Sequence, residues 1–314
     1  MRHALFLVTI AVVFFFGGCL SASAQVSIPP AAHLQKLIDE GAGFVRVTES
    51  IEVSQSIRTR SHLTIFCEPG VEIKAKPGSF LGPNAKEASN SMVQVVDVED
   101  VQIVNCTFTM NKAEFTQPSE FRHTVRVTGS KNIRLVGVNV KDAGGDGFYL
   151  GVDDNVQPGQ VRRAVENVTL DRCKALNSSR QGLTILSCKG CYIYDSEFSG
   201  SVGASPQSGV DIEAGSFTDV LQDIFVVRCK SFGHKGHAYM ASLARQNETS
   251  APVSITFADC EGGVLACWSD SDAGPKSLFH VRAFSSGSWP GSLGTKNTGT
   301  VKVQYGGKVV CQWP

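Results

Sequence analysis

The sequence predicts an all-β fold in which the chain coils into a parallel β-helix, a solenoid of stacked turns. One of the two observations behind this is an eight-residue pattern: apolar, any, apolar, any, any, small or Cys, any, apolar or small. It occurs six times, at residues 101–108, 133–140, 168–175, 191–198, 224–231 and 255–262. A pattern that returns every 23 to 35 residues indicates successive turns that stack on one another.

The other observation is a second set of short alternating segments that follow the repeats after a turn. Three of them begin at Gly147, Gly182 and Gly209, and a less regular fourth begins at Gly236. These glycines lie 35, 27 and 27 residues apart, which matches one coil per step. A turn that needs positive φ or close stacking favours glycine at such a position.

One short helix is predicted before the strands begin. Residues 28–42 contain two leading prolines, an apolar face made by Leu34, Leu37 and Ile38, and Gly41 as a stop. A helix at the end of an all-β stack covers an exposed row of backbone groups. We therefore expect one solenoid domain over residues 25–314, with 28–42 as its capping helix and 276–314 as closing coils.

The first 24 residues are typical of a secretory signal peptide, with a basic start, an apolar run at 5–16 and a small-x-small cleavage site at 22–24. The apolar run is too short to span a bilayer, so no transmembrane segment is predicted. We expect a secreted or periplasmic protein. Lipid attachment at Cys19 is an alternative that the preceding Phe16 disfavours.

Charge gives little direction toward a partner. Lysine plus arginine and aspartate plus glutamate both number 29, so the net charge is zero. No excess of basic residues points to nucleic acid or to an anionic membrane. We expect a monomer.

The sixth position of the repeat forms a column of small residues: Cys106, Val138, Cys173, Ser196, Cys229 and Cys260. Side chains in one column point the same way, whereas a disulfide needs Cβ atoms that converge. We therefore expect these four cysteines to be free and buried. Cys188 and Cys191 could pair or be redox-active, but we favour Cys191 as an inward residue and Cys188 in a turn.

The order of these elements resembles the right-handed parallel β-helix proteins of the pectin-lyase-like superfamily. The resemblance covers residues 30–265 and includes 45–75 and the segments GGDGFYLG, NSSRQGLTI and SGVDIEAG. It implies a right-handed coil, and most members are lyases, hydrolases or epimerases of polysaccharides, while others only bind. The G-H-G of polygalacturonases is half matched by GHKGH at 233–237, and their R-I-K is absent, as are the epimerase and pectate-lyase motifs.

Strand alternation places a set of polar residues on one outer face. If Phe148, Leu183 and Val210 point inward, then the residues that follow them point outward in one column. That column is Tyr149, Thr184 and Asp211, with Glu213 two residues further along the same strand as Asp211. The turns that enter these strands add Asp142, Asp146, Arg180, Gln181, His234 and Lys235.

This patch predicts a carbohydrate-active enzyme that acts on a polysaccharide, with an acidic one favoured. The predicted catalytic residues are Asp211, Glu213, Asp146, Arg180 and His234, and the predicted substrate-binding residues are Tyr149, Asp142, Gln181, Thr184 and Lys235. Paired carboxyls suit hydrolysis, because like charges raise one pKa and supply an acid. Lyase or epimerase chemistry stays open, with Arg180 or a Ca²⁺ held by the acids as the cation.

Structural roles are the alternatives for several of these residues. Asp142 and Asn177 occupy equivalent turn positions and could cap backbone groups, which we favour. Asp146 and Arg180 could form a surface ion pair of little consequence. His237 falls at an inward position after Gly236 and is expected to be buried. The alternative function is a non-catalytic polysaccharide-binding or structural protein of the cell envelope.

Overall fold

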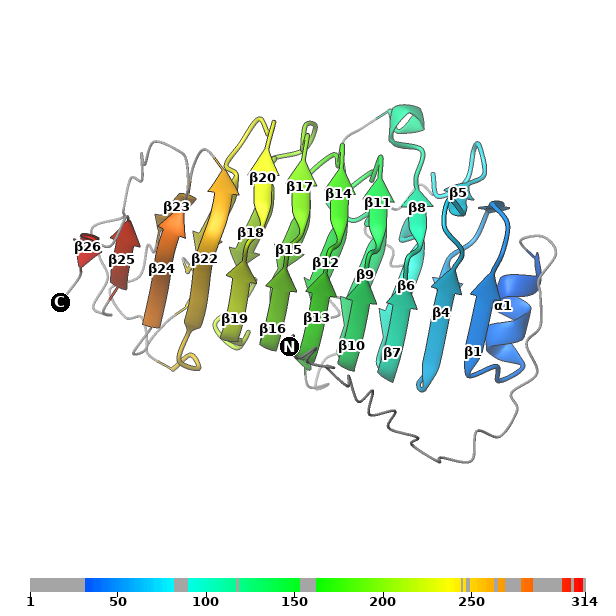
Figure 1. Cartoon of the computed structure of the whole chain (residues 1–314), viewed down its shortest axis with the longest axis horizontal. Coiled ribbons are helices and arrows are strands. Elements are labelled where there is room, and N and C mark those ends of the chain that lie inside the picture. Colours follow the sequence, from blue (N-terminus) through cyan, green and yellow to red (C-terminus); the bar gives the residue numbers. More distant parts are fainter. Residues whose placement is uncertain are drawn as a thin grey trace, which may run out of the picture.

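The computed structural model describes residues 32–81, 90–116, 119–152, 162–243, 245–246, 249–262, 265–268, 278–284, 301–305 and 308–312. These residues form one elongated stack of coils with a short helix at one end (Figure 1). The right-handed parallel β-helix that the sequence predicts is confirmed. The residues of the predicted signal peptide, 1–24, lie outside the described part of the chain.

Each coil contributes strands to three faces, and strands on a face pair with those of the next coil. The first face is made of β1 (Phe44–Val47), β4 (Leu63–Cys67), β7 (Glu99–Val104), β10 (Lys131–Val136), β13 (Val165–Asp171), β16 (Cys188–Tyr194), β19 (Leu221–Val227), β22 (Ser254–Gly262), β24 (Leu278–Phe284), β25 (Val301–Tyr305) and β26 (Lys308–Gln312). The second face is made of β2 (Ile51–Val53), β5 (Glu72–Ala75), β8 (Thr107–Thr109), β11 (Asn139–Lys141), β14 (Lys174–Leu176), β17 (Glu197–Ser199), β20 (Lys230–Phe232) and the end of β22. The third face is made of β3 (Ile57–Arg58), β6 (Val93–Val96), β9 (Val125–Thr128), β12 (Phe148–Gly151), β15 (Leu183–Ile185), β18 (Val210–Glu213), β21 (Tyr239–Ser242) and β23 (Leu265–Trp268).

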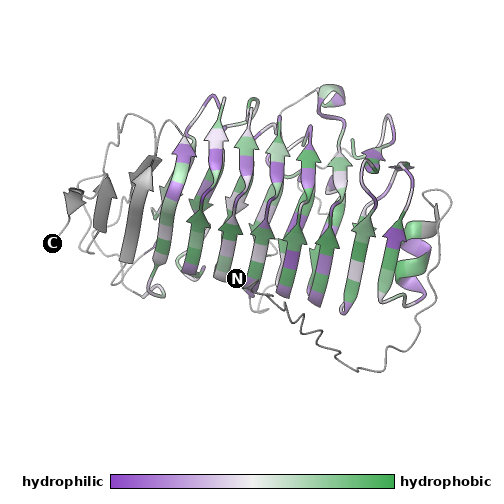
Figure 2. Ribbon diagram, viewed as in Figure 1, coloured by the Kyte–Doolittle hydropathy of each residue, from purple (hydrophilic) through white to green (hydrophobic). Residues whose placement is uncertain are grey.

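The eight-residue pattern spans the first and second faces of each coil. In the copy at 101–108, Val101 and Ile103 point inward from β7 and Phe108 points inward from β8, and all three are fully buried. Apolar and polar residues alternate along these strands (Figure 2). Each buried aliphatic or aromatic side chain contributes about 1.5–3 kcal/mol, so the inward columns hold the coils together.

A tight turn joins the two faces within each repeat, and its first residue has a left-handed backbone. This residue is Asn105, Gly137, Arg172, Asp195, Arg228 or Asp259, each with φ between 49° and 61°. The next residue is the small, buried sixth position of the pattern. The pattern therefore encodes a corner of the coil, with a left-handed residue, exposed in five of the six copies, followed by a buried small one.

The predicted capping helix is confirmed as α1 (Ala32–Asp39), which is shorter than 28–42. Leu34 and Ile38 are buried from it, and α1 packs against β1 and β3. The helix ends before Gly41, whose φ of 97° is left-handed. Residues 28–31 of the predicted helix lie outside the described part of the chain.

At the other end, the predicted closing coils continue the first face. β24 pairs with β22 and β25 with β24 in parallel, and β26 then returns antiparallel to β25. No helix among the described residues is long and apolar enough to cross a membrane.

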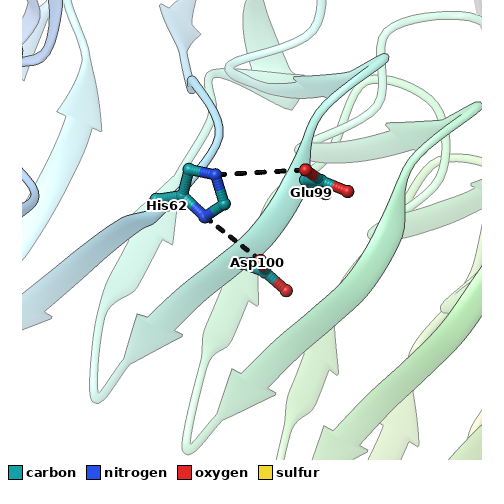
Figure 3. A group of neighbouring side chains, drawn as sticks. All are labelled: His62, Glu99 and Asp100. Carbon is teal, nitrogen blue, oxygen red and sulfur yellow. Dashed lines mark ion pairs between the residues drawn. The ribbon is translucent and has the colours of Figure 1, made fainter.

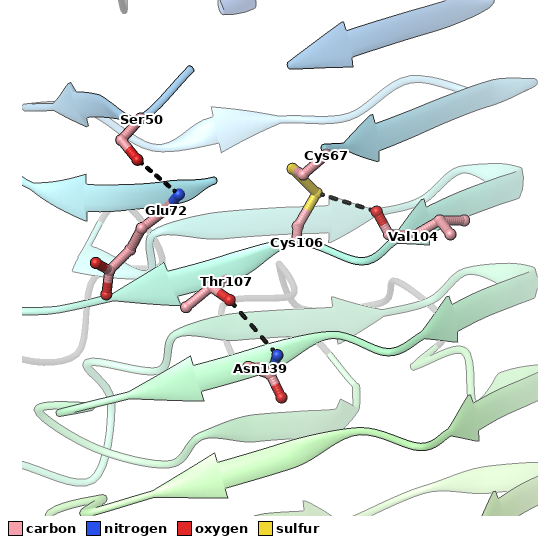
Figure 4. The surroundings of a disulfide bond; sticks show 7 residues. All are labelled: Ser50, Cys67, Glu72, Val104, Cys106, Thr107 and Asn139. Atoms are coloured by element: carbon pink, nitrogen blue, oxygen red, sulfur yellow. Dashed lines mark hydrogen bonds between the residues drawn. A yellow bond between two sulfur atoms is a disulfide. The ribbon is translucent and has the colours of Figure 1, made fainter. Parts of the chain in front are cut away.

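The cysteine predictions hold in part. Cys173, Cys229 and Cys260 are free and buried, as expected. Cys106, however, forms a disulfide with Cys67 (Figure 4), so the prediction for Cys106 is wrong. The strand register explains why this disulfide can form. Phe66 pairs with Val104, so Cys67 lies opposite residue 105 and is not stacked in one column with Cys106. The two side chains can therefore converge across a Cα–Cα distance of 4.9 Å.

Cys188 and Cys191 also form a disulfide, and both lie in β16 with fully buried side chains. The favoured placement of Cys188 in a turn was wrong, while Cys191 is inward as expected. Gly190 between them has φ 75°, and this left-handed residue shortens the path of the strand. Pairing, the alternative, is what the structure shows.

Candidate functional site

The predicted outward column exists. β12 pairs with β15 and β15 with β18, and this register aligns Tyr149 with Thr184 and Thr184 with Asp211. The column is not exposed to solvent, however, because these residues are 5, 2 and 0% exposed. The expectation of an open external face is therefore wrong here.

The segment between β8 and β9 covers part of this column. It includes a short 3₁₀ helix, η2 (Lys112–Glu114), and ends at His123 and Thr124. The ring of His123 stacks on the ring of Tyr149, with centroids 4.4 Å apart. The guanidinium of Arg122 lies over the Phe115 ring.

Two glycines permit this close approach. A Cβ on Gly144 would overlap the Phe115 ring, and a Cβ on Gly145 would lie 2.9 Å from the backbone nitrogen of Arg122. The GGDG sequence at 144–147 thus lets the covering segment reach the backbone of the turn that carries Asp146. This segment contains no copy of the repeat, so the alternation of apolar residues could not predict that it packs over the column.

Asp146 is fully buried at the centre of a polar network. Its Oδ1 accepts a hydrogen bond from the Gln181 backbone N–H at 3.1 Å, and its Oδ2 accepts one from Thr184 Oγ1 at 2.9 Å. Arg180 Nη1 lies 3.4 Å and His123 Nδ1 lies 3.3 Å from Oδ2. Burial alone raises the pKa of Asp146, but the charges of Arg180 and His123 and these hydrogen bonds outweigh it and hold the pKa below its usual value. The buried pair with Arg180 replaces the surface ion pair considered from the sequence.

Asp211 has the opposite electrostatic state. Its Oδ2 accepts a hydrogen bond from Gln181 Nε2, and Gln181 Oε1 in turn accepts one from the Ser208 backbone N–H. Burial first, and then the charge of Glu213, raise the pKa of Asp211 well above its usual value, although Arg180 opposes this. Asp211 Oδ1 accepts no hydrogen bond from any described residue. A protonated Asp211 would donate that proton to Glu213, because two carboxyls can bond to each other only through a shared proton.

Arg180 lies among four carboxyl groups. Burial lowers its pKa, but the charges of Asp146, Asp211, Glu120 and Glu213 raise it more, so the guanidinium stays charged. Its side chain is 14% exposed, and its Nε is 3.9 Å from Glu120 Oε2. Two of the four carboxyls are buried, whereas Glu213 is half-buried and Glu120 is exposed. The network thus reaches solvent through Glu213, Arg180 and Glu120.

His234 lies outside this network. Its Nδ1 accepts a hydrogen bond from the Ser201 backbone N–H at 3.1 Å, and its Nε2 lies 3.1 Å from the Phe198 carbonyl and 3.0 Å from Ser231 Oγ. Burial lowers the pKa of His234 to about 4. Both ring nitrogens thus contact its own coil and the preceding one, and this geometry does not favour the predicted catalytic role. The neighbouring Lys235 is exposed on the same turn.

Asp142 also belongs to a turn. It has a left-handed φ of 53°, and its Oδ1 accepts a hydrogen bond from Asn177 Nδ2 at 2.6 Å. Lys112 Nζ extends this ladder to Asn177 Oδ1 and to two backbone carbonyls. Asp142 is therefore a turn residue, but its carboxylate binds the Asn177 side chain of the next coil rather than the backbone groups that it was expected to cap. This contact does not favour its predicted role in substrate binding.

The predicted register after Gly236 is shifted by two residues. Tyr239, not His237, pairs with Val210, and Ala238 occupies the place of Gly209. His237 is half-buried rather than buried. The fully buried Tyr239 donates its hydroxyl toward the carbonyls of Cys229 and Glu261.

Glu120, Arg122 and His123 were not among the predicted site residues. They lie between two copies of the repeat, at 101–108 and 133–140, in a connection of 15 residues from the end of β8 to the start of β9. The sequence feature that could have identified them is the unusually polar connection between regular strands, since functional side chains concentrate on such loops.

A separate cluster on the first face consists of His62, Glu99 and Asp100 (Figure 3). His62 Nδ1 is 3.1 Å from Asp100 Oδ2, and His62 Nε2 is 3.9 Å from Glu99 Oε1. All three side chains are about half exposed or more. Exposed pairs of this kind contribute little to stability, and no buried ligand completes a metal site among the residues described here.

Known proteins support the fold assignment. No family model matches the chain. A curated relative, the SPbeta prophage-derived uncharacterized protein YorA of Bacillus subtilis (strain 168), is 21% identical over 220 residues, which is 67% of this chain and 36% of that protein. The chain therefore spans little more than a third of the length of this relative.

Two solved structures share the architecture at low sequence identity. One is a polygalacturonase from Erwinia carotovora ssp. carotovora, with TM-score 0.51 and 15% identity over 91% of this chain and 81% of that chain. The other is a 1,3-α-1,4-β-D-galactose-4-sulfate-3,6-anhydro-D-galactose-2-sulfate 4 galactohydrolase, with TM-score 0.50 and 10% identity over 81% of this chain and 65% of that chain. The chain thus shares the right-handed parallel β-helix fold of these two proteins.

Proposed function

We propose that the protein is an exported carbohydrate-active enzyme that hydrolyses a polysaccharide at the network around Arg180. The observation that carries this proposal is that the buried Asp211 belongs to a network that reaches solvent through the half-buried Glu213 and the partly exposed Arg180. The raised pKa of Asp211 beside Glu213 favours the protonated carboxyl that glycoside hydrolysis needs as its acid. The names of the two structurally similar hydrolytic enzymes are consistent with it.

Glu213 is the group that would meet the sugar, because it is half-buried while Asp211 is fully buried. Asp211 holds the proton that the two carboxyls share, and the pair delivers it to the oxygen of the leaving sugar. This role requires no solvent exposure of Asp211 itself.

The remaining network residues position this pair. Gln181 bridges the two buried acids, since its backbone N–H binds Asp146 and its side chain binds Asp211. Thr184 holds the Asp146 carboxylate, which is saturated with contacts and acts on Arg180 rather than on substrate. His123 Nδ1 accepts a hydrogen bond from the Asp146 backbone N–H. Tyr149 supports His123 by stacking.

Arg180 takes the place that a Ca²⁺ ion would have between the acids. Its guanidinium lies close to Asp146 and its charge acts on Asp211 and Glu213, so a cation is already supplied by the chain. We propose that activity is independent of Ca²⁺. A chelator such as EDTA should leave the rate unchanged.

The test is a panel of polysaccharides, with polygalacturonate and alginate beside neutral glucans because the sequence favours an acidic substrate. Products are assayed as new reducing ends and as ultraviolet-absorbing unsaturated sugars. Hydrolysis gives reducing ends alone, and Glu213→Gln should lower the rate at least 100-fold. Unsaturated products would show a lyase instead, and a Glu213→Gln variant of unchanged rate would exclude this site.

A non-catalytic polysaccharide-binding protein is the second candidate, and the complete burial of Asp146 and Asp211 favours it. In that case the network only stiffens the third face. Oligosaccharides would then bind in calorimetry, but no product of either kind would form with any member of the panel.

A further inference from the structure

We propose that Glu120 is the second solvent-facing carboxylate of this site and acts as the base that activates water. The inference rests on the proposed hydrolytic function and assigns it a residue that no repeat pattern marks. Glycoside hydrolysis needs one group that donates a proton and one carboxylate that activates water or attacks the sugar. The Asp211–Glu213 pair supplies the first.

Asp146 is unsuited to the second role. It is fully buried, and both of its oxygens are engaged by Gln181, Thr184 and Arg180. A carboxylate in this state has no lone pair directed toward solvent and no route to a water molecule beside the sugar. The base must come from another acid near Arg180.

Glu120 meets these requirements. Its side chain is 59% exposed, and its Oε2 lies 3.9 Å from Arg180 Nε. Ser119, which precedes it, and Arg122, two residues after it, are buried, and the Arg122 carbonyl accepts a hydrogen bond from the Gly145 backbone N–H at 2.7 Å. The backbone at Glu120 is thus anchored on both sides, while its carboxylate reaches solvent beside the guanidinium.

A second observation concerns the nitrogen of Arg180 that faces Glu120. Arg180 Nε is buried, yet it donates no hydrogen bond to any described residue. Buried polar atoms are normally paired, and an exception suggests a functional group kept for another partner. Glu120 Oε2 lies 3.9 Å from this nitrogen, so a ligand bound beside Arg180 would meet both groups.

The reaction step balances with these groups alone. Glu120 takes a proton from water as the water oxygen bonds to the anomeric carbon. The glycosidic C–O bond breaks, and the leaving oxygen takes the proton held by Asp211 and Glu213. Glu120 then releases its proton, and the carboxyl pair regains one from solvent.

The test compares Glu120→Ala with Glu166→Ala, a matched control. Glu166 is 50% exposed and lies 4.0 Å from Lys131, so it also loses one exposed ion pair. Initial rates are measured on a polysaccharide that the wild type cleaves, with and without added azide. Urea unfolding of each variant checks the fold.

We expect Glu120→Ala to lose at least 100-fold in rate, with Glu166→Ala within twofold of the wild type. Azide should partly restore the rate of Glu120→Ala by attacking the anomeric carbon in place of activated water, giving a glycosyl azide visible by mass spectrometry. A Glu120→Ala rate near that of the wild type overturns the inference while hydrolysis stands. A loss that azide does not restore, or a change in KM alone, also overturns the role as base. A wild type that cleaves no polysaccharide refutes the proposed function itself and this inference with it.

Discussion

Arg180 lies 3.4 Å from Asp146 in a pair whose carboxylate is fully buried and whose guanidinium is 14% exposed. The pair joins two neighbouring coils, since Asp146 precedes β12 and Arg180 precedes β15. A buried pair adds little net stability compared with an apolar replacement, but removal of one partner leaves a buried charge without compensation. Substitution of either residue of this pair alone should therefore lower the free energy of unfolding substantially.

Asp146→Asn should destabilise the protein by about 3 kcal/mol, because the Arg180 guanidinium loses its principal counter-charge. The free energy of unfolding in urea measures this. Asp195→Asn is the control, since Asp195 also pairs with an arginine, Arg228, but on the exposed surface of the coil. The control should not change the unfolding midpoint measurably, and equal losses in the two variants would contradict this account of Asp146.

Asp211→Asn should behave in the opposite way and stabilise the protein at neutral pH. The folded-state pKa of Asp211 is raised, so its contribution is fully present below the unfolded-state pKa and is lost as pH rises through the folded-state value. Asparagine resembles the protonated acid and does not ionise, so the variant keeps this contribution to stability as the pH rises. The advantage of the variant should be small near pH 4 and grow with pH, at up to about 1.4 kcal/mol per unit.

Urea unfolding of both proteins from pH 4 to pH 8 tests this relationship. Asparagine cannot deliver a proton, so the same variant should lose polysaccharide hydrolysis while it gains stability. A variant that is less stable than the wild type at every pH would show that Asp211 is ionised in the folded protein.

The sequence was sufficient for the fold because inward residues recur at fixed places in every coil. The residues that follow Phe148, Leu183 and Val210 also align as alternation predicts. Their burial could not be predicted, because the cover arises from the connection between β8 and β9, which has no repeat and no characteristic spacing. Packing between a loop and a strand face depends on three-dimensional contacts such as that of His123 with Tyr149.

The same limit explains the misassigned polar residues. His234 was predicted as a catalyst because it lies in a turn that enters these strands, yet its ring contacts the backbone of Ser201 and Phe198 in the preceding coil. Asp142 was correctly interpreted as a turn residue because a left-handed Asp or Asn has a local sequence signature. Turn conformation was thus predictable from the local sequence. The contacts that a side chain makes with a neighbouring coil were not.

Gly145→Ala should detach the covering segment, because its Cβ would lie 2.9 Å from the backbone nitrogen of Arg122 and backbone yields little. Overpacking of this kind costs about 1–3 kcal/mol. Loss of the stack between His123 and Tyr149 should reduce the near-ultraviolet circular dichroism of tyrosine. Gly43→Ala is the control, with ordinary contact at 3.5 Å from its nearest neighbour, and should leave the spectrum unchanged. An unchanged spectrum in Gly145→Ala would show that the segment adjusts freely.

Cys106→Ser should destabilise the protein far more than Cys173→Ser, although both cysteines are fully buried at the same position of the repeat. Cys106 closes a disulfide with Cys67 across a separation of 39 residues, whereas Cys173 is free. The chain-entropy model gives about 4 kcal/mol for a loop of this length, while loss of a buried thiol alone costs about 1–2 kcal/mol. Ser196 occupies the same column naturally, so serine fits the corner in both variants.

Urea unfolding under oxidising conditions measures the difference between these two variants. Addition of a reductant during unfolding should lower the stability of the wild type toward that of Cys106→Ser and leave Cys106→Ser itself almost unchanged. Peptide mapping of the alkylated, unreduced protein should recover the Cys67 and Cys106 peptides as one linked species. Equal costs for the two serine variants, or separate alkylated peptides, would show that Cys106 is a free thiol like its neighbours in the column.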